Sequence, residues 1–173
     1  MYQPNKILKL LCPAVYQIST AGHNIYLTFD DGPHAVYTAE ILSILKEYGI
    51  KATFFVVGQN AEEFPSLVKQ AAEEGHEIGN HTYSHPDMSA IADPAAFRAE
   101  LTAVEEKYKT VTGQEMPKYY RPPQGTYSVE NLKNAKELGY KTVFWSLAYV
   151  DWNNDAQPTK EQAFSKLLPR IHN

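Results

Sequence analysis

Apolar positions along the chain follow two spacings, and each spacing predicts a different element. Runs rich in β-branched and aromatic residues predict buried strands, whereas apolar residues three and four apart, closed by a glycine, predict helices. The predicted strands cover residues 25–29, 52–57, 76–80, 118–120 and 142–147. The predicted helices, caps included, cover 37–48, 60–75, 93–113, 128–139 and 159–168. Strand and helix units in series favour one α/β domain with a parallel sheet, open or closed into a barrel.

The predicted helices begin at residues that suit a helix start. Asn60 has Glu63 three positions on, which is the spacing of a capping box. Asp93 is followed by a proline at the first helical position. Ser128 and Thr159 stand at the starts of the last two helices. These residues agree with the apolar spacing and support the same boundaries.

Composition and charge narrow the class of protein. Of 173 residues, 43% are hydrophobic and 21% are charged, which predicts a packed globular domain. The net charge of −4, with no long Lys/Arg run, argues against nucleic acid as a partner. No apolar run reaches the roughly 18 residues of a membrane span, so no membrane-spanning helix is expected. A single cysteine, Cys12, excludes an intrachain disulfide but does not identify the compartment.

The ends of the chain suggest domain limits. We expect residues 1–22 to form an N-terminal segment ahead of one domain over residues 23–173. Residues 7–15 are apolar like part of a signal peptide, but Lys9 and Pro13 interrupt them, so no signal peptide is predicted. The sequence stops after a predicted helix, where another strand should follow. We therefore expect the domain to be incomplete at its C-terminal end.

Polar residues cluster just past the predicted strand ends. The clusters are Asp30-Asp31-Gly32-Pro33, His81 with His85, Arg121-Pro-Pro-Gln-Gly125, and Asp151-Trp152. The C-terminal ends of parallel strands meet on one face, which is where such folds place their active sites. The shared location of the clusters favours an active site more strongly than any cluster alone.

The first two clusters suit a metal site. Asp-Asp-Gly-Pro alone is more typical of a turn. The functional interpretation is one carboxylate that binds a metal and one that acts as a base. His81 and His85 share a cation if they lie on one helical turn. Pro86 disfavours helical geometry at His85, so a loop is the alternative. Two histidines and one carboxylate leave positions open for water and substrate, the pattern of a catalytic metal.

The later clusters suit substrate and charge positioning. Arg121 precedes a rigid Pro-Pro loop, and its fixed charge suits orienting a carboxylate and keeping it ionised. The stiff loop around Pro123 would present the backbone N–H of Gln124 to an oxyanion. Trp152 is either a core residue or one wall of a sugar groove. We therefore expect Pro123, Gln124 and Trp152 to border the substrate.

The clusters together resemble the first four motifs of the polysaccharide deacetylases, the NodB-homology or carbohydrate esterase family 4 enzymes. They read Thr28-Phe-Asp-Asp-Gly-Pro33, His81-Thr-Tyr-Ser-His-Pro86, Arg121-Pro-Pro-Gln-Gly125 and Asp151-Trp152. The resemblance implies a distorted (β/α)₇ barrel that hydrolyses N-acetyl groups of a sugar polymer, which is the cleavage of an amide bond.

The resemblance also implies roles for individual residues. Asp30 would be the general base, and one divalent metal, usually zinc, would be held by Asp31, His81 and His85. Arg121 would orient Asp30, and Asp151 would belong to the supporting charge network. The residues alone do not decide which aspartate is the base.

Three departures from the family pattern stand out. The fourth motif often begins with Asp, and here that position is Ala148. The sequence of this motif resembles that of the subgroup that deacetylates N-acetylmuramic acid in peptidoglycan. That subgroup often carries Asn where this chain has Asp31. The fifth motif, a Leu-x-His that supplies the general acid, is not found, and His172 is not assigned that role. Without that histidine we expect turnover to be impaired.

The predicted function is thus a metal-dependent de-N-acetylase acting on peptidoglycan. A chitooligosaccharide or acetylxylan deacetylase is the alternative, and a non-catalytic carbohydrate-binding domain is the alternative from another class. We expect a monomer in the cell envelope or outside a bacterial cell.

Overall fold

The structure, a computed structural model, describes residues 24–171 and is built on a parallel sheet. The strands are β1 (Thr28–Gly32), β2 (Thr53–Val56), β3 (Glu77–Asn80), β4 (Tyr119–Tyr120) and β5 (Lys141–Thr142), and they lie in that consecutive order. Every neighbouring pair is parallel. In a βα-barrel each strand lies beside the strand that precedes it in the sequence, whereas in a doubly wound sheet the strand order reverses direction once. The predicted α/β class with a parallel sheet is confirmed.

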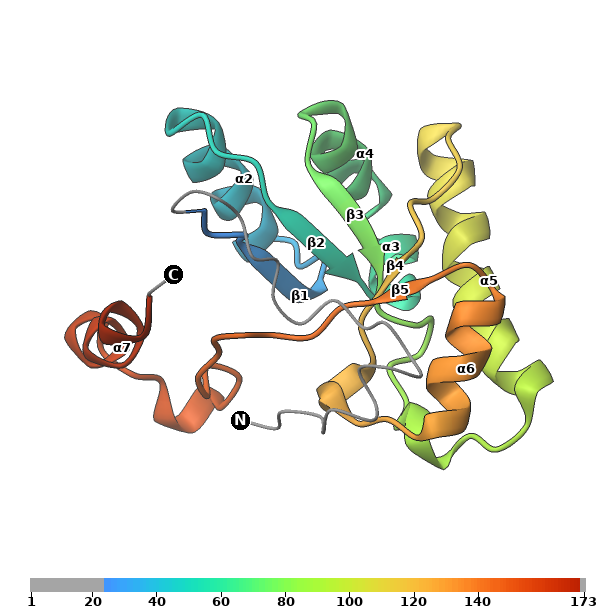
Figure 1. Cartoon of the computed structure of the whole chain (residues 1–173). Helices are drawn as coiled ribbons and strands as arrows, with labels where there is room; N and C mark the ends of the chain where they lie inside the picture. The colour runs from blue at the N-terminus through green and yellow to red at the C-terminus, as the bar shows by residue number, and fades with distance from the viewer. Residues whose placement is uncertain (1–23, 172–173) are drawn as a thin grey trace.

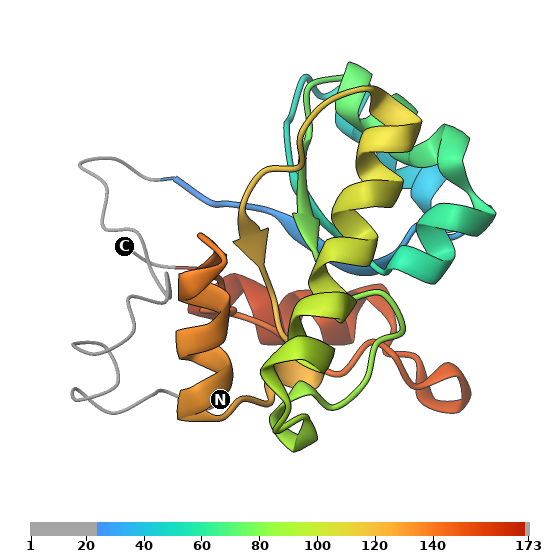
Figure 2. The same cartoon turned by 90° about the vertical axis from the view of Figure 1, so that its right-hand side faces the viewer.

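Most of the helices cover one face of this sheet. The helices are α2 (Tyr37–Glu47), α3 (Gly58–Glu63), α4 (Pro65–Glu73), α5 (Pro94–Thr112), α6 (Val129–Glu137) and α7 (Lys160–Leu167). Short 3₁₀ helices are η1 (Met88–Ala90), η2 (Pro123–Gly125), η3 (Asn154–Ala156) and η4 (Leu168–Arg170). The helices α2, α4, α5 and α6 lie on one side of the strands, while α7 lies apart at the left of Figure 1. The turned view shows the same helical layer beside the sheet (Figure 2).

The core lies between the strands and this helical layer. One buried cluster joins α2 and α4 to β2 and β3, and it includes Leu42, Phe54, Val56, Val68 and Ile78. A second cluster joins α5 and α6 to β4, and it includes Phe97, Leu101, Tyr120, Ala135 and Tyr140. Successive side chains of a strand point to opposite faces of the sheet. The strand residues that alternate with these core positions therefore lie on the face that points away from the helices.

That face is tightly filled where it reaches the site. Phe55 is 1% exposed and lies under the Arg121 guanidinium, with 4.1 Å from the guanidinium carbon to the ring centre. Gly79 on the neighbouring strand makes room for this ring, because a Cβ there would lie 2.5 Å from a Phe55 ring carbon. The sheet therefore has an apolar face toward the helices and a face that carries polar site residues.

The first strand differs from its prediction. β1 covers Thr28–Gly32 instead of residues 25–29, and Ile25 and Tyr26 are each 62% exposed. The ladder with β2 sets this position, because Thr28 pairs with Thr53 and Phe29 with Phe54. Asp30 and Asp31 consequently lie in the last part of the strand rather than after it.

Two other predicted elements are interrupted. The helix predicted over 60–75 is two helices, because Pro65 has no N–H and disfavours helical geometry at Phe64, which has φ −124° and ψ 58°. Asn60 therefore lies within α3 and does not cap a helix. The strand predicted over 142–147 pairs only at Lys141–Thr142, because β4 offers just two residues.

The other helix starts are confirmed. Asp93 accepts a hydrogen bond from the Ala95 N–H, Ser128 accepts one from the Asn131 N–H, and Thr159 forms a capping box with Gln162. Within residues 24–171, no helix has the length and apolar content needed to cross a bilayer. The N-terminal segment, Cys12 and His172 lie outside the described residues.

Candidate metal and catalytic site

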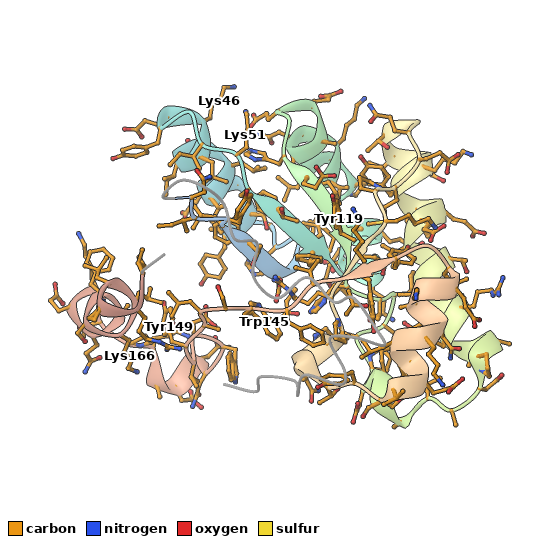
Figure 3. The ribbon with its side chains drawn as sticks, in the orientation of Figure 1. Lys46, Lys51, Tyr119, Trp145, Tyr149 and Lys166 are labelled. Atoms are coloured by element: carbon orange, nitrogen blue, oxygen red, sulfur yellow. The ribbon has the colours of Figure 1, made fainter. Side chains whose placement is uncertain are left out.

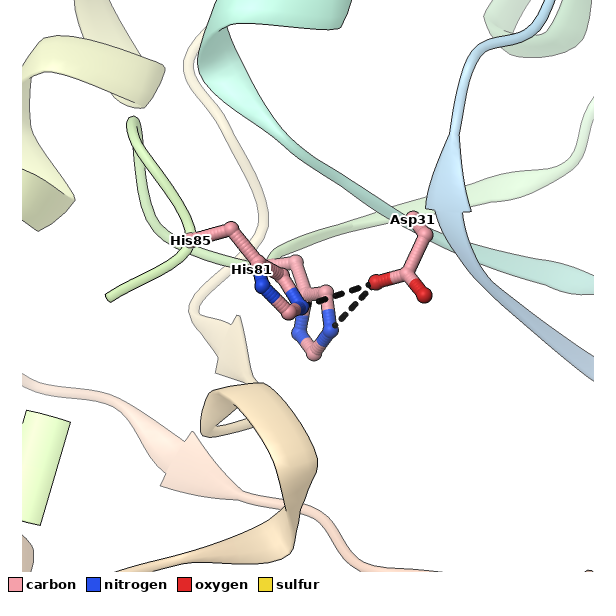
Figure 4. Close-up of side chains that lie close together, drawn as sticks. All are labelled: Asp31, His81 and His85. Atoms are coloured by element: carbon pink, nitrogen blue, oxygen red, sulfur yellow. Dashed lines mark ion pairs between the residues drawn. The ribbon is translucent and has the colours of Figure 1, made fainter. Parts of the chain in front are cut away.

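Three potential metal ligands meet at the C-terminal ends of β1 and β3. The Asp31 Oδ1 lies 3.2 Å from the His81 Nε2 and 3.0 Å from the His85 Nε2. One ligand atom from each residue falls within 4.8 Å of the others. Figure 4 shows both imidazole rings turned toward the Asp31 carboxylate. The convergence expected from the strand ends is present.

Unusual backbone conformations occur at two of these residues and beside the third. Asp31, Thr82 and His85 adopt the left-handed region, with φ of 63°, 68° and 56°. This region is unfavourable for residues other than glycine, so neighbouring contacts must hold it. The Asn60 side-chain amide donates to the Asp31 carbonyl at 2.7 Å. His85 lies on a loop, so of the two geometries left open by the sequence, the loop is found.

A hydrogen bond sets the protonation pattern of His81. Its Nδ1 lies 2.7 Å from the Arg121 carbonyl oxygen, which can only accept. The Nδ1 therefore donates its N–H to this carbonyl, and the Nε2 is the ring nitrogen that faces Asp31 and is available to bind a cation. A carbonyl in this position is a common outer partner of a metal-binding histidine.

Asp30 is held on both of its carboxylate oxygens. The Arg121 Nη1 donates to Oδ1 at 2.6 Å, and the Trp145 Nε1 donates to Oδ2 at 3.0 Å. Arg121 is 1% exposed, and its Nη1 also donates to the Thr28 hydroxyl at 2.8 Å. The predicted Arg121–Asp30 contact is therefore direct. Figure 3 labels Trp145 on the segment after β5, close to the end of β1 in this view.

Comparisons with known proteins agree with this geometry. The family model described as polysaccharide deacetylase matches residues 17–143. The chain is 41% identical over 160 residues to the peptidoglycan-N-acetylmuramic acid deacetylase PdaA of Bacillus subtilis. The aligned region covers 92% of this chain and 60% of that protein. It is 44% identical over 135 residues to a peptidoglycan-N-acetylglucosamine deacetylase of Bacillus cereus, covering 78% of this chain and 48% of that protein.

The chain belongs to the polysaccharide deacetylase family.

The solved structures of the family agree with this assignment. The structure of B. subtilis PdaA, a family 4 carbohydrate esterase, superposes with a TM-score of 0.89 at 39% identity, covering 96% of this chain and 70% of that one. The strand order described above is thus that of the polysaccharide deacetylase barrel. The chain spans about 60% of the length of curated relatives such as PdaA.

The three converging residues fit a divalent metal. Tetrahedral bonds of about 2.0–2.2 Å place two ligand atoms about 3.4 Å apart, and the two Asp31–histidine distances are 3.2 and 3.0 Å. Hydrogen bonds from His81 and His85 lower the pKa of Asp31 well below its usual range. The hydrogen bond to Asp31 raises the pKa of His85. The carboxylate therefore attracts positive charge to this point, and a cation would take the place of a shared proton.

The other predicted site residues differ in their burial and contacts. Partial burial of the carboxyl group raises the pKa of Asp151, and the negative charges of Asp30 and Asp31 raise it further. Among the described residues, no hydrogen bond joins Asp151 to Arg121. Pro123 is buried, Gln124 is exposed with φ 57°, and Trp152 is 70% exposed. The core alternative for Trp152 is therefore wrong.

Two residues that contact the candidate site were not predicted from the sequence. Trp145 donates a hydrogen bond to Asp30, and the centre of its ring lies 4.8 Å from the Arg121 guanidinium carbon. The ring also packs closely on Gly125, because a Cβ added to that glycine would lie 2.7 Å from a ring carbon of Trp145. Glu100 binds the loop before His85. The aromatic Trp145, three positions before Ala148, was a visible signal, whereas Glu100 looks like any polar residue on a helix.

Proposed function

We propose that this chain is a metal-dependent hydrolase that removes N-acetyl groups from peptidoglycan. One observation carries the proposal: an Asp–His–His cluster lies beside an aspartate whose two oxygens are already bound by Arg121 and Trp145. The names of the B. subtilis and B. cereus relatives support peptidoglycan as the substrate.

We assign the metal site to Asp31, His81 and His85, with zinc as the ion. Two imidazoles and one carboxylate suit zinc and leave positions open for water and substrate. When bound, such an ion lowers the pKa of water and polarises an acyl oxygen.

Asp30 takes the role of general base. Its carboxylate is held in one orientation by Arg121 on Oδ1 and Trp145 on Oδ2, each of which leaves a further lone pair on that oxygen. A positioned carboxylate of this kind accepts the proton of the attacking water. Burial lowers the pKa of Arg121, and the neighbouring Asp30 opposes this shift. An arginine guanidinium keeps its positive charge in proteins.

The loop after β4 binds the developing oxyanion in this proposal. Pro122 and Pro123 fix its backbone, and the Gln124 N–H is the donor. The family resemblance assigns protonation of the leaving amine to a histidine on a later strand. Asp151 supports the charge network, and Trp152 forms one wall of the sugar groove. The protein acts as a monomer in the bacterial cell envelope or outside the cell.

The test is acetate release from three substrates: peptidoglycan strands without stem peptides, N-acetylglucosamine oligomers and acetylxylan. We expect release from peptidoglycan, loss of release after chelation, and recovery with zinc. Release from the oligomers or from acetylxylan alone would replace the substrate assignment. Binding of glycan without release of acetate from any substrate, by zinc-loaded protein, would favour the non-catalytic alternative.

A further inference from the structure

The loop that carries His85 is held on one side by the start of α3. The N–H groups of Gly58 and Gln59 donate to the carbonyl oxygens of Thr82 and Tyr83 at 2.9 and 3.0 Å. Gly58 is required for this approach, because a Cβ there would lie 2.4 Å from the Tyr83 ring. These bonds satisfy the loop carbonyls and leave its N–H groups to be satisfied elsewhere.

Glu100 of α5 binds those N–H groups from the other side. Its Oε2 accepts from the N–H groups of Tyr83 and Ser84, both at 2.9 Å. Its Oε1 accepts from the Ser84 hydroxyl at 2.8 Å. One carboxylate therefore receives three hydrogen bonds from two consecutive loop residues. Hydrogen bonds to an ionised group are about twice as strong as neutral ones.

His85 depends on this loop more than His81 does. The His81 side chain is 2% exposed and its Nδ1 is bound by the Arg121 carbonyl. The His85 side chain is 32% exposed, and among residues 24–171 no hydrogen bond to its Nδ1 is found. Its N–H donates to the Thr82 hydroxyl at 3.1 Å, and both residues are in the left-handed region. The direction of the His85 ring is therefore set mainly by the backbone of residues 82–85.

We propose that Glu100 is a positioning residue of the metal site: it holds the loop so that the His85 Nε2 faces Asp31 and His81. It does not contact the metal or the substrate. The inference rests on the proposed function, since it requires Asp31, His81 and His85 to be metal ligands. Outer-shell partners of metal ligands commonly contribute about 10–100-fold in metal affinity, and Glu100 supports one of three ligands.

The test compares Glu100→Gln, Glu100→Asp and Glu100→Ala with the wild-type chain. The dissociation constants for Zn²⁺ and Co²⁺ are measured by chelator competition, and the Co²⁺ absorption spectrum reports the ligand geometry. Glu106→Ala is the matched control, because Glu106 lies exposed on the same helix. Thermal unfolding of each metal-free variant shows that binding is measured on folded protein.

We expect Glu100→Ala to weaken Zn²⁺ binding by about 10–100-fold and to alter the Co²⁺ spectrum. Gln retains an oxygen that accepts both N–H groups, so its affinity should stay within about threefold of wild type. Asp is one methylene shorter and should fall between Gln and Ala. Glu106→Ala should match wild type.

Two failures are distinguishable. If the wild-type chain binds neither metal, the proposed function fails at its metal site. If the wild-type chain binds metal and Glu100→Ala binds it within about twofold, with an unchanged Co²⁺ spectrum, then only the role of Glu100 is refuted. Glu100→Asp decides by the same criterion if Glu100→Ala does not fold.

Discussion

The buried pair of Arg121 and Asp30 allows a quantitative test by replacing each partner and then both. Their side chains are 1% and 16% exposed, and Nη1 and Oδ1 lie 2.6 Å apart. In Arg121→Met the Asp30 carboxylate loses its counter-charge, and removing one partner of a buried pair costs about 3–5 kcal/mol in the free energy of unfolding. Trp145 still donates to Asp30, which places the expected loss near the lower end, at about 3 kcal/mol.

Asp30→Asn is expected to be milder. It leaves Arg121 between the rings of Phe55 and Trp145, with the Thr28 hydroxyl and the Val143 carbonyl as acceptors. Cation–π contacts of this kind contribute about 1–2 kcal/mol when desolvated, so we expect a loss of about 1–3 kcal/mol. The double variant has neither charge to leave unpaired. Its loss should therefore be smaller than the sum of the two by about 2 kcal/mol or more.

The assay is urea unfolding of the four proteins at neutral pH with a chelator present, so that metal binding does not enter the comparison. The exposed pair of Lys133 and Glu130, 3.5 Å apart, is the control, and the same cycle there should give a coupling below about 0.5 kcal/mol. Additive losses within about 0.5 kcal/mol for Arg121 and Asp30 would refute the view that the two charges depend on each other.

Three further predictions follow from single contacts. Asp30→Asn should keep metal binding and lower acetate release by about 10²–10⁴-fold, the usual contribution of a general base; equal loss of metal and activity would mean that the roles of Asp30 and Asp31 are exchanged. Trp145→Phe keeps an aromatic ring beside Arg121 but removes the hydrogen-bond donor to Asp30. We expect kcat to fall about tenfold with little change in KM. An unchanged kcat would contradict this expectation. Burial lowers the pKa of His76 below its ordinary value of 6.5. The unfolded chain then binds that proton more readily, so the free energy of unfolding falls as the pH drops below about 6.5. His76→Asn keeps an acceptor for the Ala52 N–H and should flatten this dependence in urea titrations, and an equal slope in both proteins would contradict it.

The apolar spacing predicted the helices better than the strands. The stripe of Phe97, Leu101, Val104 and Tyr108 is buried as expected, because a long helix repeats its pattern over several turns. The short strands offer no such repetition, and their ends depend on the neighbouring strand. The first strand therefore begins three residues later than predicted, where Thr28 meets Thr53.

The site was predictable as a location more than as a set of contacts. The proximity of Asp31, His81 and His85 could be predicted, because the C-terminal ends of the strands in a parallel sheet lie at the same edge. The left-handed backbone at Asp31 and the contacts of Glu100 could not be found this way. They depend on segments that pack together only in the folded chain, such as α5 against the loop after β3.

Zinc X-ray absorption on the loaded chain is the most decisive measurement of the proposed metal site. We expect one zinc per chain with nitrogen and oxygen neighbours at about 2.0–2.2 Å, two of them imidazoles. In His85→Ala the imidazole contribution should fall by half, while Asp30→Asn should leave the spectrum unchanged. A sulfur neighbour at about 2.3 Å, or a spectrum that does not respond to His85→Ala, would contradict the assignment of Asp31, His81 and His85 as the metal site.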